Sequence, residues 1–467
     1  MDRTVDLAEV LDRQRIGRPL LTVIIVCGLV TLADGYNISA AGFAAPGIVK
    51  DWGLSRALLG PLFSSALLAG FVGPALFGTL AGRFGRRPTI LAATVLFGAF
   101  GLLCGACRSL MPLVACRFVA GIGMSGALAV TVANMSEFAP RRLRATFVTL
   151  IFSGTTIGSG AIGLVAPWLT GHFHWQGIFI FGGALTLLSA AFVFLFLPES
   201  PKYLCLQASR HAQLACLLCR LDPRLAFPIG VYFVQSDEPS PSRVVPKQFF
   251  AGPLLVLTPL LWLGSFAGQV VFHSFNNWLP TLLTDSGLPY ARAAAAVVLF
   301  QFAGTLGGWV IMRPLDRYGM WPCALLYGLS LPVVACLGLP GISATMLLIL
   351  CAGAGFCVLG LHFAQVFCVT NIYPTAIRAL GVGIFMLFAR AGGSLGPYLV
   401  GILMAHHVPV SRLFVLATVP LAIGTIAAIT ITLVYWTHFR VPDKVSPTLS
   451  CMPLQSGGGT SLTCNEN

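Results

Sequence analysis

Long apolar runs alternate with short polar segments along most of the chain. Twelve of these runs are at least about 20 residues long, which at 1.5 Å per residue is enough to span a ~30 Å hydrocarbon core. The pattern therefore predicts an all-α integral membrane protein with twelve transmembrane helices in two six-helix bundles. The expected spans cover residues 20–46, 57–80, 88–107, 110–135, 145–168, 176–197, 253–278, 292–313, 321–340, 343–371, 379–403 and 412–436.

A longer polar stretch, residues 199–249, divides the spans into two sets of six that look like copies. Arg83-Phe84-Gly85 matches Arg317-Tyr318-Gly319 at an offset of 234 residues, and the same offset carries Arg144 onto Arg378. Parallel six-span repeats predict a transporter whose binding site lies between the halves, near the midplane. The expected units are an N-terminal segment (1–19), a first bundle (20–198), a linker (199–249), a second bundle (250–438) and a disordered tail (439–467).

Composition agrees with the span pattern, because only 9% of the residues are charged and the mean hydropathy is +0.86. Soluble domains carry about 25% charged residues. The net charge of +13 does not indicate nucleic-acid binding, because Lys and Arg gather on one predicted side. By the positive-inside rule this side is cytoplasmic. We expect a multi-pass protein of the inner (plasma) membrane with both termini in the cytoplasm. We also expect it to be a monomer. The few basic residues expected outside are Lys50, Arg56, Arg108, Arg292 and Arg412.

Metal, cofactor and enzymatic chemistry find little support in the sequence. The fourteen cysteines are scattered, and neither CxxC pair has a second pair at zinc-site spacing. No nucleophile–base set or phosphate loop is present. We therefore expect no enzyme, no catalytic residues, no metal and no cofactor. His273 and His362 lie within spans and are interpreted as packing residues that are also able to touch a substrate.

Asp34 lies inside the first apolar run. A carboxylate at that depth costs roughly 2.5–3.5 kcal/mol on insertion scales, so it should face a bundle interior or a watery cavity. Intramembrane carboxyl groups of this kind carry protons in transporters. We predict that Asp34 is the proton-coupling residue. The alternative is a carboxyl group that only hydrogen-bonds neighbouring helices.

Arg117 and Arg390 are the arginines that the pattern places within spans. A guanidinium donates two parallel hydrogen bonds to a carboxylate, so both are predicted to bind a small organic acid anion. The alternative is a structural pairing with Asp34 or Glu137. Further candidate substrate contacts, chosen for stacking or polar capacity, are Tyr36, Asn37, Trp278, Asn276 and Asn277.

The turn from Gly78 to Pro88 is punctuated by glycines and carries three arginines. Such arginines pair with carboxylates or with the last carbonyls of helices, which favours a latch at the cytoplasmic side. Positive-inside anchoring is the alternative explanation of the charges. Glycines in the fifth and eleventh spans favour close helix packing. The predicted gating residues are Gly78, Arg83, Gly85, Arg86, Arg87, Glu137, Arg144, Asp316, Arg317 and Arg378.

These motifs carry a family resemblance. Gly78–Pro88 resembles the signature loop of the major facilitator superfamily, and the chain is more specifically similar to its aromatic acid:proton symporters, the group of the 4-hydroxybenzoate/protocatechuate transporters. The closer likeness rests on motifs spread over residues 20–436: Asp34-Gly35-Tyr36-Asn37, Asp51-Trp52-Gly53-Leu54, the segment from Arg117 to Gly123, Ser136-Glu137-Phe138-Ala139-Pro140, Leu197-Pro198-Glu199-Ser200, Asn277-Trp278-Leu279-Pro280, and the segment from Tyr373 to Arg378.

Two positions depart from the family's pattern. Asn37 stands where the second acid of an Asp-Gly-aromatic-Asp motif is usual, and Gly82 stands where the signature loop usually has Asp. The resemblance implies import of a small aromatic or related organic acid anion with protons, by alternating access. The loss of the second acid favours one proton for each anion.

Two other functions stay open at this point. A proton-coupled drug or metabolite exporter typically has Gly-Pro in the middle of the fifth span, and here Gly158 is followed by Ser159. A non-transporting membrane sensor on the same scaffold would need an added soluble domain, for which the linker and tail are short.

Overall fold

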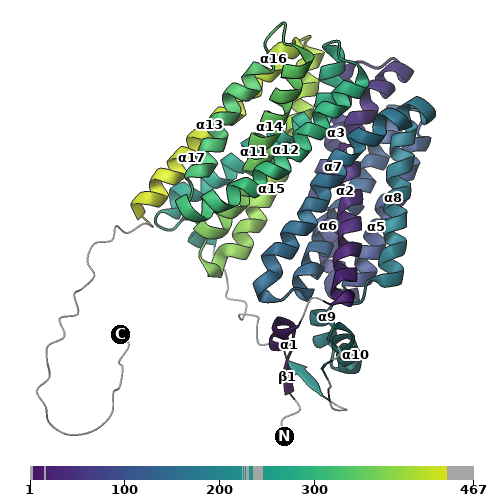
Figure 1. The fold of residues 1–467 in the computed structure, drawn as a ribbon, viewed down its shortest axis with the longest axis vertical. Coiled ribbons are helices and arrows are strands. Elements are labelled where there is room, and N and C mark those ends of the chain that lie inside the picture. Colours follow the sequence, from purple (N-terminus) through teal and green to yellow (C-terminus); the bar gives the residue numbers. More distant parts are fainter. Residues whose placement is uncertain are drawn as a thin grey trace, which may run out of the picture.

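The computed structural model describes residues 4–14, 17–222, 224–225, 227, 231–234 and 246–438. This part of the chain is almost entirely helical (Figure 1). It contains eleven helical stretches that are long and apolar enough to cross a membrane. They are α2 (Arg18–Trp52), the stretch Arg56–Phe84, α5 (Arg86–Ala106), α6 (Leu110–Phe138), α7 (Arg144–Phe173), α8 (Gln176–Phe196), α11 (Leu254–Asp285), α12 (Tyr290–Tyr318), α14 (Ala344–Ile372), α15 (Thr375–Ala405), and α16 (Val410–Leu416) with α17 (Thr418–His438).

The predicted ninth span is the shorter apolar helix α13 (Trp321–Cys336). Its 16 residues make about 24 Å of helix at 1.5 Å per residue, less than a ~30 Å hydrocarbon core. It packs against α14 and α17, within the second set of helices. Every predicted span therefore corresponds to helix, and most helices extend a few residues past the apolar runs.

The second span is interrupted, which the apolar pattern did not predict. It consists of η1 (Arg56–Leu58), α3 (Leu59–Leu68), the 3₁₀ turn η2 (Ala69–Phe71) and α4 (Gly73–Phe84). Pro74 explains the break, because it has no N–H to donate and its ring clashes with the carbonyl four residues back. That carbonyl belongs to Gly70, which therefore lies at the break.

A small cap covers one end of the first helix set (Figure 1). Strand β1 (Thr4–Asp6) pairs in parallel with β2 (Tyr232–Val234), in the register Thr4↔Tyr232. The cap also contains α1 (Leu7–Arg13), α9 (Pro201–Cys205), η4 (Ala208–Arg210) and α10 (His211–Leu221), and η5 (Pro246–Phe250) leads into α11.

The N-terminal segment and part of the linker are thus packed structure. Leu7, Leu214 and Phe233 share a buried apolar cluster with residues of α2, and the Gln14 side chain donates to the Phe138 carbonyl over 2.6 Å. The domain boundaries remain predictions, and the tail beyond residue 438 lies outside the described residues.

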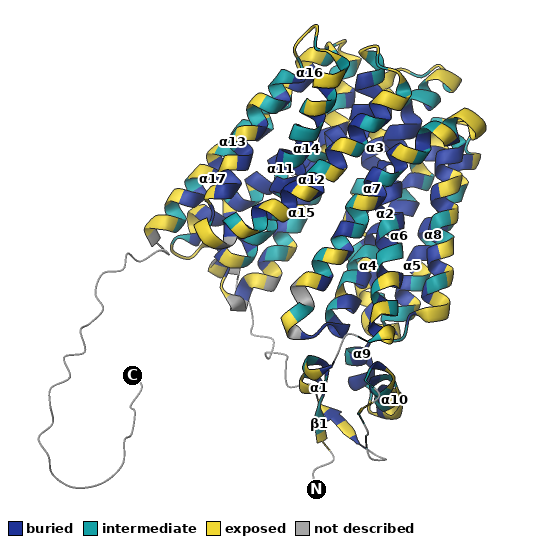
Figure 2. Ribbon diagram, viewed as in Figure 1, coloured by how far each residue is buried: buried dark blue, intermediate teal, exposed yellow. Residues whose placement is uncertain are grey.

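The two helix sets meet along part of their length. Three helix pairs contribute to this contact. Helix α2 packs against α11, α3 packs against α15, and α7 packs against α12. The larger buried apolar cluster is continuous across this contact and includes Phe63 and Trp278, whose rings meet edge to face at 4.9 Å. Large apolar side chains are exposed on the outer faces of the helices, as expected of surfaces in contact with lipid (Figure 2).

Polar contacts also join the two sets toward the end opposite α9 and α10. Arg56 forms an ion pair of 2.5 Å with Asp285. The Tyr290 hydroxyl donates to the Phe43 carbonyl over 2.8 Å, and the Ser64 hydroxyl donates to the Ser394 carbonyl over 2.6 Å. At the α9–α10 end, the described residues show no ion pair between the sets.

Candidate functional site

Asp34 lies on α2 where this helix crosses α7, and its side chain is buried. Glycines make the crossing possible: a Cβ at Gly35 would lie 1.8 Å from the Thr155 carbonyl oxygen, and one at Gly158 would lie 2.0 Å from that of Leu32. Small residues let helix backbones approach this closely. The predicted glycine-rich fifth span therefore places α7 directly beside the turn of α2 that carries Asp34.

Arg390 of α15 is the charged partner of Asp34, and it belongs to the other helix set. Its guanidinium lies against Gly70, where an added Cβ would be 2.3 Å from Nη1. The break in the second span thus makes the space that the arginine occupies. Among the described ion pairs, none joins Asp34 to Arg390 at an N–O distance of 4.0 Å or less. The two charges thus interact electrostatically across the interface without forming an ion pair.

Two histidines extend this polar region into the second set. The imidazole of His273 on α11 interacts electrostatically with Arg390 and with His362 of α14. His362 Nδ1 lies 2.5 Å from Nε2 of Gln269, one turn before His273. The sequence predicts both histidines as packing residues that are also able to touch a substrate, and it does not indicate their place beside the arginine. Their helical positions hold no signal for this, because α15 is distant in sequence.

A second polar chain crosses the interface between α2, α11 and α12. Asn276 Oδ1 accepts hydrogen bonds from the Ser39 hydroxyl at 3.1 Å and from Gln301 Nε2 at 2.6 Å. All three residues are buried, and both Nδ2 of Asn276 and Oε1 of Gln301 lack a partner among the described residues. Asn276 was a predicted substrate contact, whereas Ser39 and Gln301 were not.

Arg117 of α6 lies in a different environment. Its Nη1 donates to the Asn37 carbonyl over 3.0 Å, its Cζ is 5.8 Å from the centre of the Phe179 ring, and Nε has no partner within the described chain. The residue is 4% exposed. All these neighbours belong to the first helix set, so the structure does not bring Arg117 together with Arg390.

The remaining predicted contacts are buried by packing. Tyr36 donates to the Ile178 carbonyl over 3.1 Å, and Asn37 Nδ2 donates to the Ala33 carbonyl over 2.9 Å, to Gly182 and to Thr186. Both therefore point toward α8. Trp278 Nε1 donates to the Pro397 carbonyl over 2.9 Å.

Asn277 differs from these packing residues. Its Nδ2 donates to the His273 carbonyl over 2.9 Å, and its Oδ1 has no partner among the residues that the structure describes.

The arginine-rich turn forms a network inside the first set. Arg86 Nη2 lies 2.8 Å from Glu137 Oε1, and the backbone N–H groups of Arg86 and Arg87 donate to Glu199. The Ser200 hydroxyl also donates to Glu137. Arg86 makes the predicted pairing with a carboxylate, whereas the Arg87 guanidinium donates to the Phe194 carbonyl. The network joins α5, α6 and α9, and a gating role for it remains a prediction.

Other predicted gating positions have simpler surroundings. Gly85 and Gly319 both have positive φ, 105° and 71°, at equivalent helix ends of the two sets, where glycine avoids strain. Gly78 faces open space. Among the other gating arginines, the Arg83 carbonyl accepts from Tyr203, Arg317 lies over the Tyr318 ring, and Arg378 Nε donates to the Tyr373 carbonyl. The side chains of Arg144 and Asp316 lie outside the described part.

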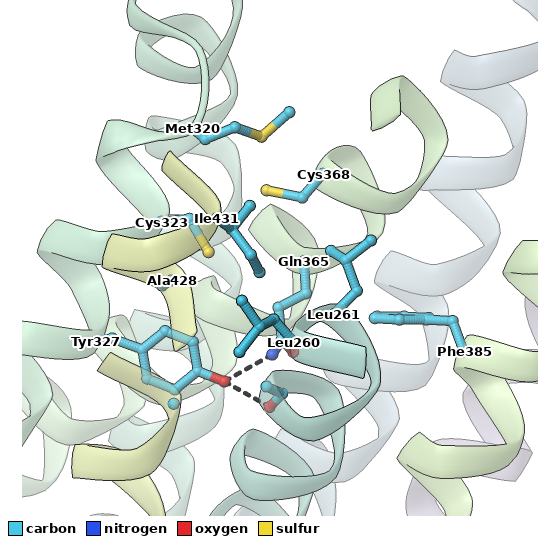
Figure 3. Close-up of a pocket in the computed structure, with 12 residues that line it drawn as sticks. Leu260, Leu261, Met320, Cys323, Tyr327, Gln365, Cys368, Phe385, Ala428 and Ile431 are labelled. Atoms are coloured by element: carbon cyan, nitrogen blue, oxygen red, sulfur yellow. Dashed lines mark hydrogen bonds between the residues drawn. The ribbon is translucent and has the colours of Figure 1, made fainter. Parts of the chain in front are cut away.

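Neither Asp34 nor Arg390 lines either of two cavities among the described residues. One, of about 20 Å³ within the second set, is bordered by Tyr327, whose hydroxyl donates to Gly264 and accepts from Gln365 (Figure 3). This volume is that of about one water molecule. The other is an apolar groove of about 890 Å³ between α3, α6 and α15. Within the described residues, no group of three or more potential ligands is arranged to hold a metal ion.

The described residues form eleven spanning helical stretches and the shorter apolar helix α13, arranged in two sets with Asp34 and Arg390 interacting across them. This is the architecture of a secondary transporter. The family model of the Major Facilitator Superfamily matches residues 27–397. The chain therefore belongs to this superfamily, and it is a transporter and not an enzyme.

Two named relatives are aromatic acid transporters, which agrees with the family resemblance carried by the motifs. The chain is 31% identical to the gallate transporter of Pseudomonas putida, with 90% of this chain and 93% of that protein covered. It is also 31% identical to the 4-hydroxybenzoate transporter PcaK of Pseudomonas aeruginosa, with 91% and 95% covered.

Solved structures share the fold. The xylose transporter XylE of E. coli, in a partially occluded inward open conformation, has a TM-score of 0.69 at 17% identity, with 90% of this chain and 98% of that chain covered.

Proposed function

We propose that this protein imports a small aromatic acid anion together with a proton, by alternating access. The observation that carries the proposal is the pair of Asp34 and Arg390, which face each other across the two helix sets without ionic contact. The names of the gallate and 4-hydroxybenzoate transporters support the substrate class.

Each member of the pair has a distinct role in this mechanism. Arg390 binds the carboxylate of the substrate through a bidentate, charge-assisted hydrogen bond. Asp34 takes up the proton. An anion bound to Arg390 weakens the attraction between Arg390 and the ionised Asp34, so a protonated Asp34 and a bound anion favour each other. Proton and substrate are thereby coupled at one interface. The predicted substrate contact of Arg117 remains a separate proposal.

The charge distribution supports an orientation. The α9–α10 end carries the arginine-rich turn and the cap, so we assign it to the cytoplasm of a cell with a plasma membrane. The Arg56–Asp285 pair and the Ser64–Ser394 hydrogen bond then close the outer end. This arrangement corresponds to a state closed to the outside. We take the monomer, with both termini in the cytoplasm, as the transporting unit.

One proton for each monoanion makes transport electroneutral. Asn37, which replaces the second acid of the family pattern, is held by α8 and offers no titratable group. Each additional proton would add about 2.3 kcal/mol of driving force per 100 mV. We therefore expect accumulation to follow the pH gradient and to respond weakly to the membrane potential.

The test is uptake of labelled 4-hydroxybenzoate into proteoliposomes with an alkaline interior. Accumulation that a protonophore abolishes supports proton-driven import. Exchange of internal for external acid without accumulation would indicate that the protein binds and moves the acid but does not couple its transport to protons. Extrusion of the acid driven by an inward proton gradient would instead support the exporter function.

A further inference from the structure

We propose that His273 contacts the substrate and, together with Asn277, hydrogen-bonds a ring hydroxyl, so that the carrier selects hydroxylated aromatic acids over benzoate. The inference rests on the proposed function, since it assumes that Arg390 holds the carboxylate. It adds a specificity-determining residue to that site.

The position of His273 follows from the packing of α11 against α15. An added Cβ at Gly393 would lie 2.5 Å from Cδ2 of His273, so the imidazole packs where α15 has no side chain. Gly393 is three residues beyond Arg390, on the same side of the helix. The imidazole is therefore beside the guanidinium, with which it interacts electrostatically. A ring whose carboxylate is bound to Arg390 comes within reach of His273.

Unmet hydrogen bonds point to a ligand. Nδ1 of His273 and Oδ1 of Asn277 are both buried and have no partner among the described residues. The two residues are four apart on α11, so their side chains lie on one face. Buried polar atoms without partners are rare and costly. A ligand that pairs with both atoms removes this cost.

A phenolic hydroxyl matches these two atoms. It is both a donor and an acceptor, the amide oxygen of Asn277 only accepts, and the imidazole nitrogen does either according to its tautomer. Benzoate has no group that fills this role and leaves both atoms unpaired. Sites that hydrogen-bond a substrate hydroxyl reject the analogue that lacks it strongly.

The other groups around His273 are accounted for by protein contacts. His362 is paired with Gln269, and Arg390 faces Asp34. Among the described residues, His273 and Asn277 thus each present an unpaired buried atom on the same face of α11. The competing function of His273 is proton transfer. In that case, substitution of His273 would shift the pH profile of uptake for all three acids.

The experiment compares uptake of benzoate, 4-hydroxybenzoate and gallate into proteoliposomes by the wild type, His273→Phe and His273→Gln. We expect the wild type to prefer the hydroxylated acids by at least about tenfold. His273→Phe should lower their uptake by about tenfold and leave benzoate within about twofold, whereas His273→Gln keeps a hydrogen-bonding group and should restore part of the preference. His406→Phe, at the exposed end of α15, is the matched control.

The outcomes separate the two proposals. Wild-type uptake of benzoate equal to that of the hydroxylated acids overturns the specificity role and leaves the proposed function standing. An equal loss for all three acids in both His273 variants, with a shifted pH profile, also overturns it in favour of proton transfer. If the wild type transports none of these acids, both the proposed function and the role of His273 fall.

Discussion

Arg117 and Arg390 are both arginines buried in spanning helices, but their neighbours differ. Arg117 contacts the Asn37 carbonyl and the Phe179 ring, which belong to its own helix set. Arg390 faces Asp34 and lies against Gly70, both of the other set. In the proposed alternating-access cycle, the neighbours of Arg117 move together with it, whereas those of Arg390 change. A buried charge is therefore informative about transport chiefly where it faces a moving partner.

The largest effect should come from removing the carboxyl group of Asp34, which interacts with Arg390 across the interface. Asp34→Asn keeps the shape of the side chain and removes its proton chemistry, so we expect accumulation to be abolished while exchange of internal for external substrate persists. Uptake and exchange in proteoliposomes measure the two activities. Asp51→Asn is the control, because this carboxylate binds Trp175 Nε1 near the end of α2. Normal accumulation by Asp34→Asn would exclude Asp34 as the proton carrier.

Removal of the interfacial arginine should come next. Arg390→Gln loses a charge-assisted hydrogen bond worth about 3 kcal/mol, which corresponds to a fall of about 100-fold in uptake efficiency. Arg390→Lys keeps the charge without the bidentate geometry and should lie between this variant and the wild type. Initial uptake rates over a range of substrate concentrations give the comparison. A variant with unchanged substrate affinity would show that the anion binds elsewhere.

Crowding the arginine should have a smaller effect than removing it. A Cβ at Gly70 would lie 2.3 Å from Nη1 of Arg390, so Gly70→Ala displaces the guanidinium. Overpacking costs about 1–3 kcal/mol, and we expect uptake to fall by about tenfold. Gly78→Ala is the control, since Gly78 faces open space. Equal uptake by both variants would contradict the placement of Arg390.

Arg117 provides the counterpart in which stability should change more than transport. Arg117→Gln loses a hydrogen bond and a cation–π contact, together about 1–2 kcal/mol. We expect a lower Tm in detergent and a fall in uptake of less than about tenfold. A loss of transport as large as that of Arg390→Gln, at unchanged Tm, would instead support the predicted substrate contact of Arg117.

The smallest effect should come from the outer ion pair. Arg56 is about half exposed in its pair with Asp285, and such pairs contribute up to about 1 kcal/mol. Arg56→Gln should therefore shift the balance toward the outward-open state by about fivefold at most. Labelling of a cysteine placed in the outer interface measures this shift. A variant in which Arg56 and Asp285 are exchanged should return the labelling to the wild-type level if the ion pair causes the shift. Labelling that stays at the level of Arg56→Gln would count against the pair.

The fold was largely predictable, because the length and hydropathy of each local segment decide whether it forms a membrane-spanning helix. Each apolar run has to bury its own backbone hydrogen bonds in a helix, so the spans, the two-set repeat and the candidates Asp34, Arg117 and Arg390 follow without knowledge of tertiary contacts. The cap escaped prediction because β1 and β2 are three-residue strands that pair across most of the first half of the chain.

The sequence by itself determined which segments are helical, which face lipid and which carry charges that must be buried for a reason. Only the tertiary structure decided that Arg390 lies across the interface from Asp34, that the contacts of Arg117 stay within its own set, and that His273 lies beside the interfacial arginine. The physical reason is that hydropathy acts along each helix, whereas the choice of partner depends on which faces pack. In this protein, Gly35 and Gly158 allow α2 to pack closely against α7, and the break before Pro74 makes room for Arg390. These packing contacts become visible only in the three-dimensional structure.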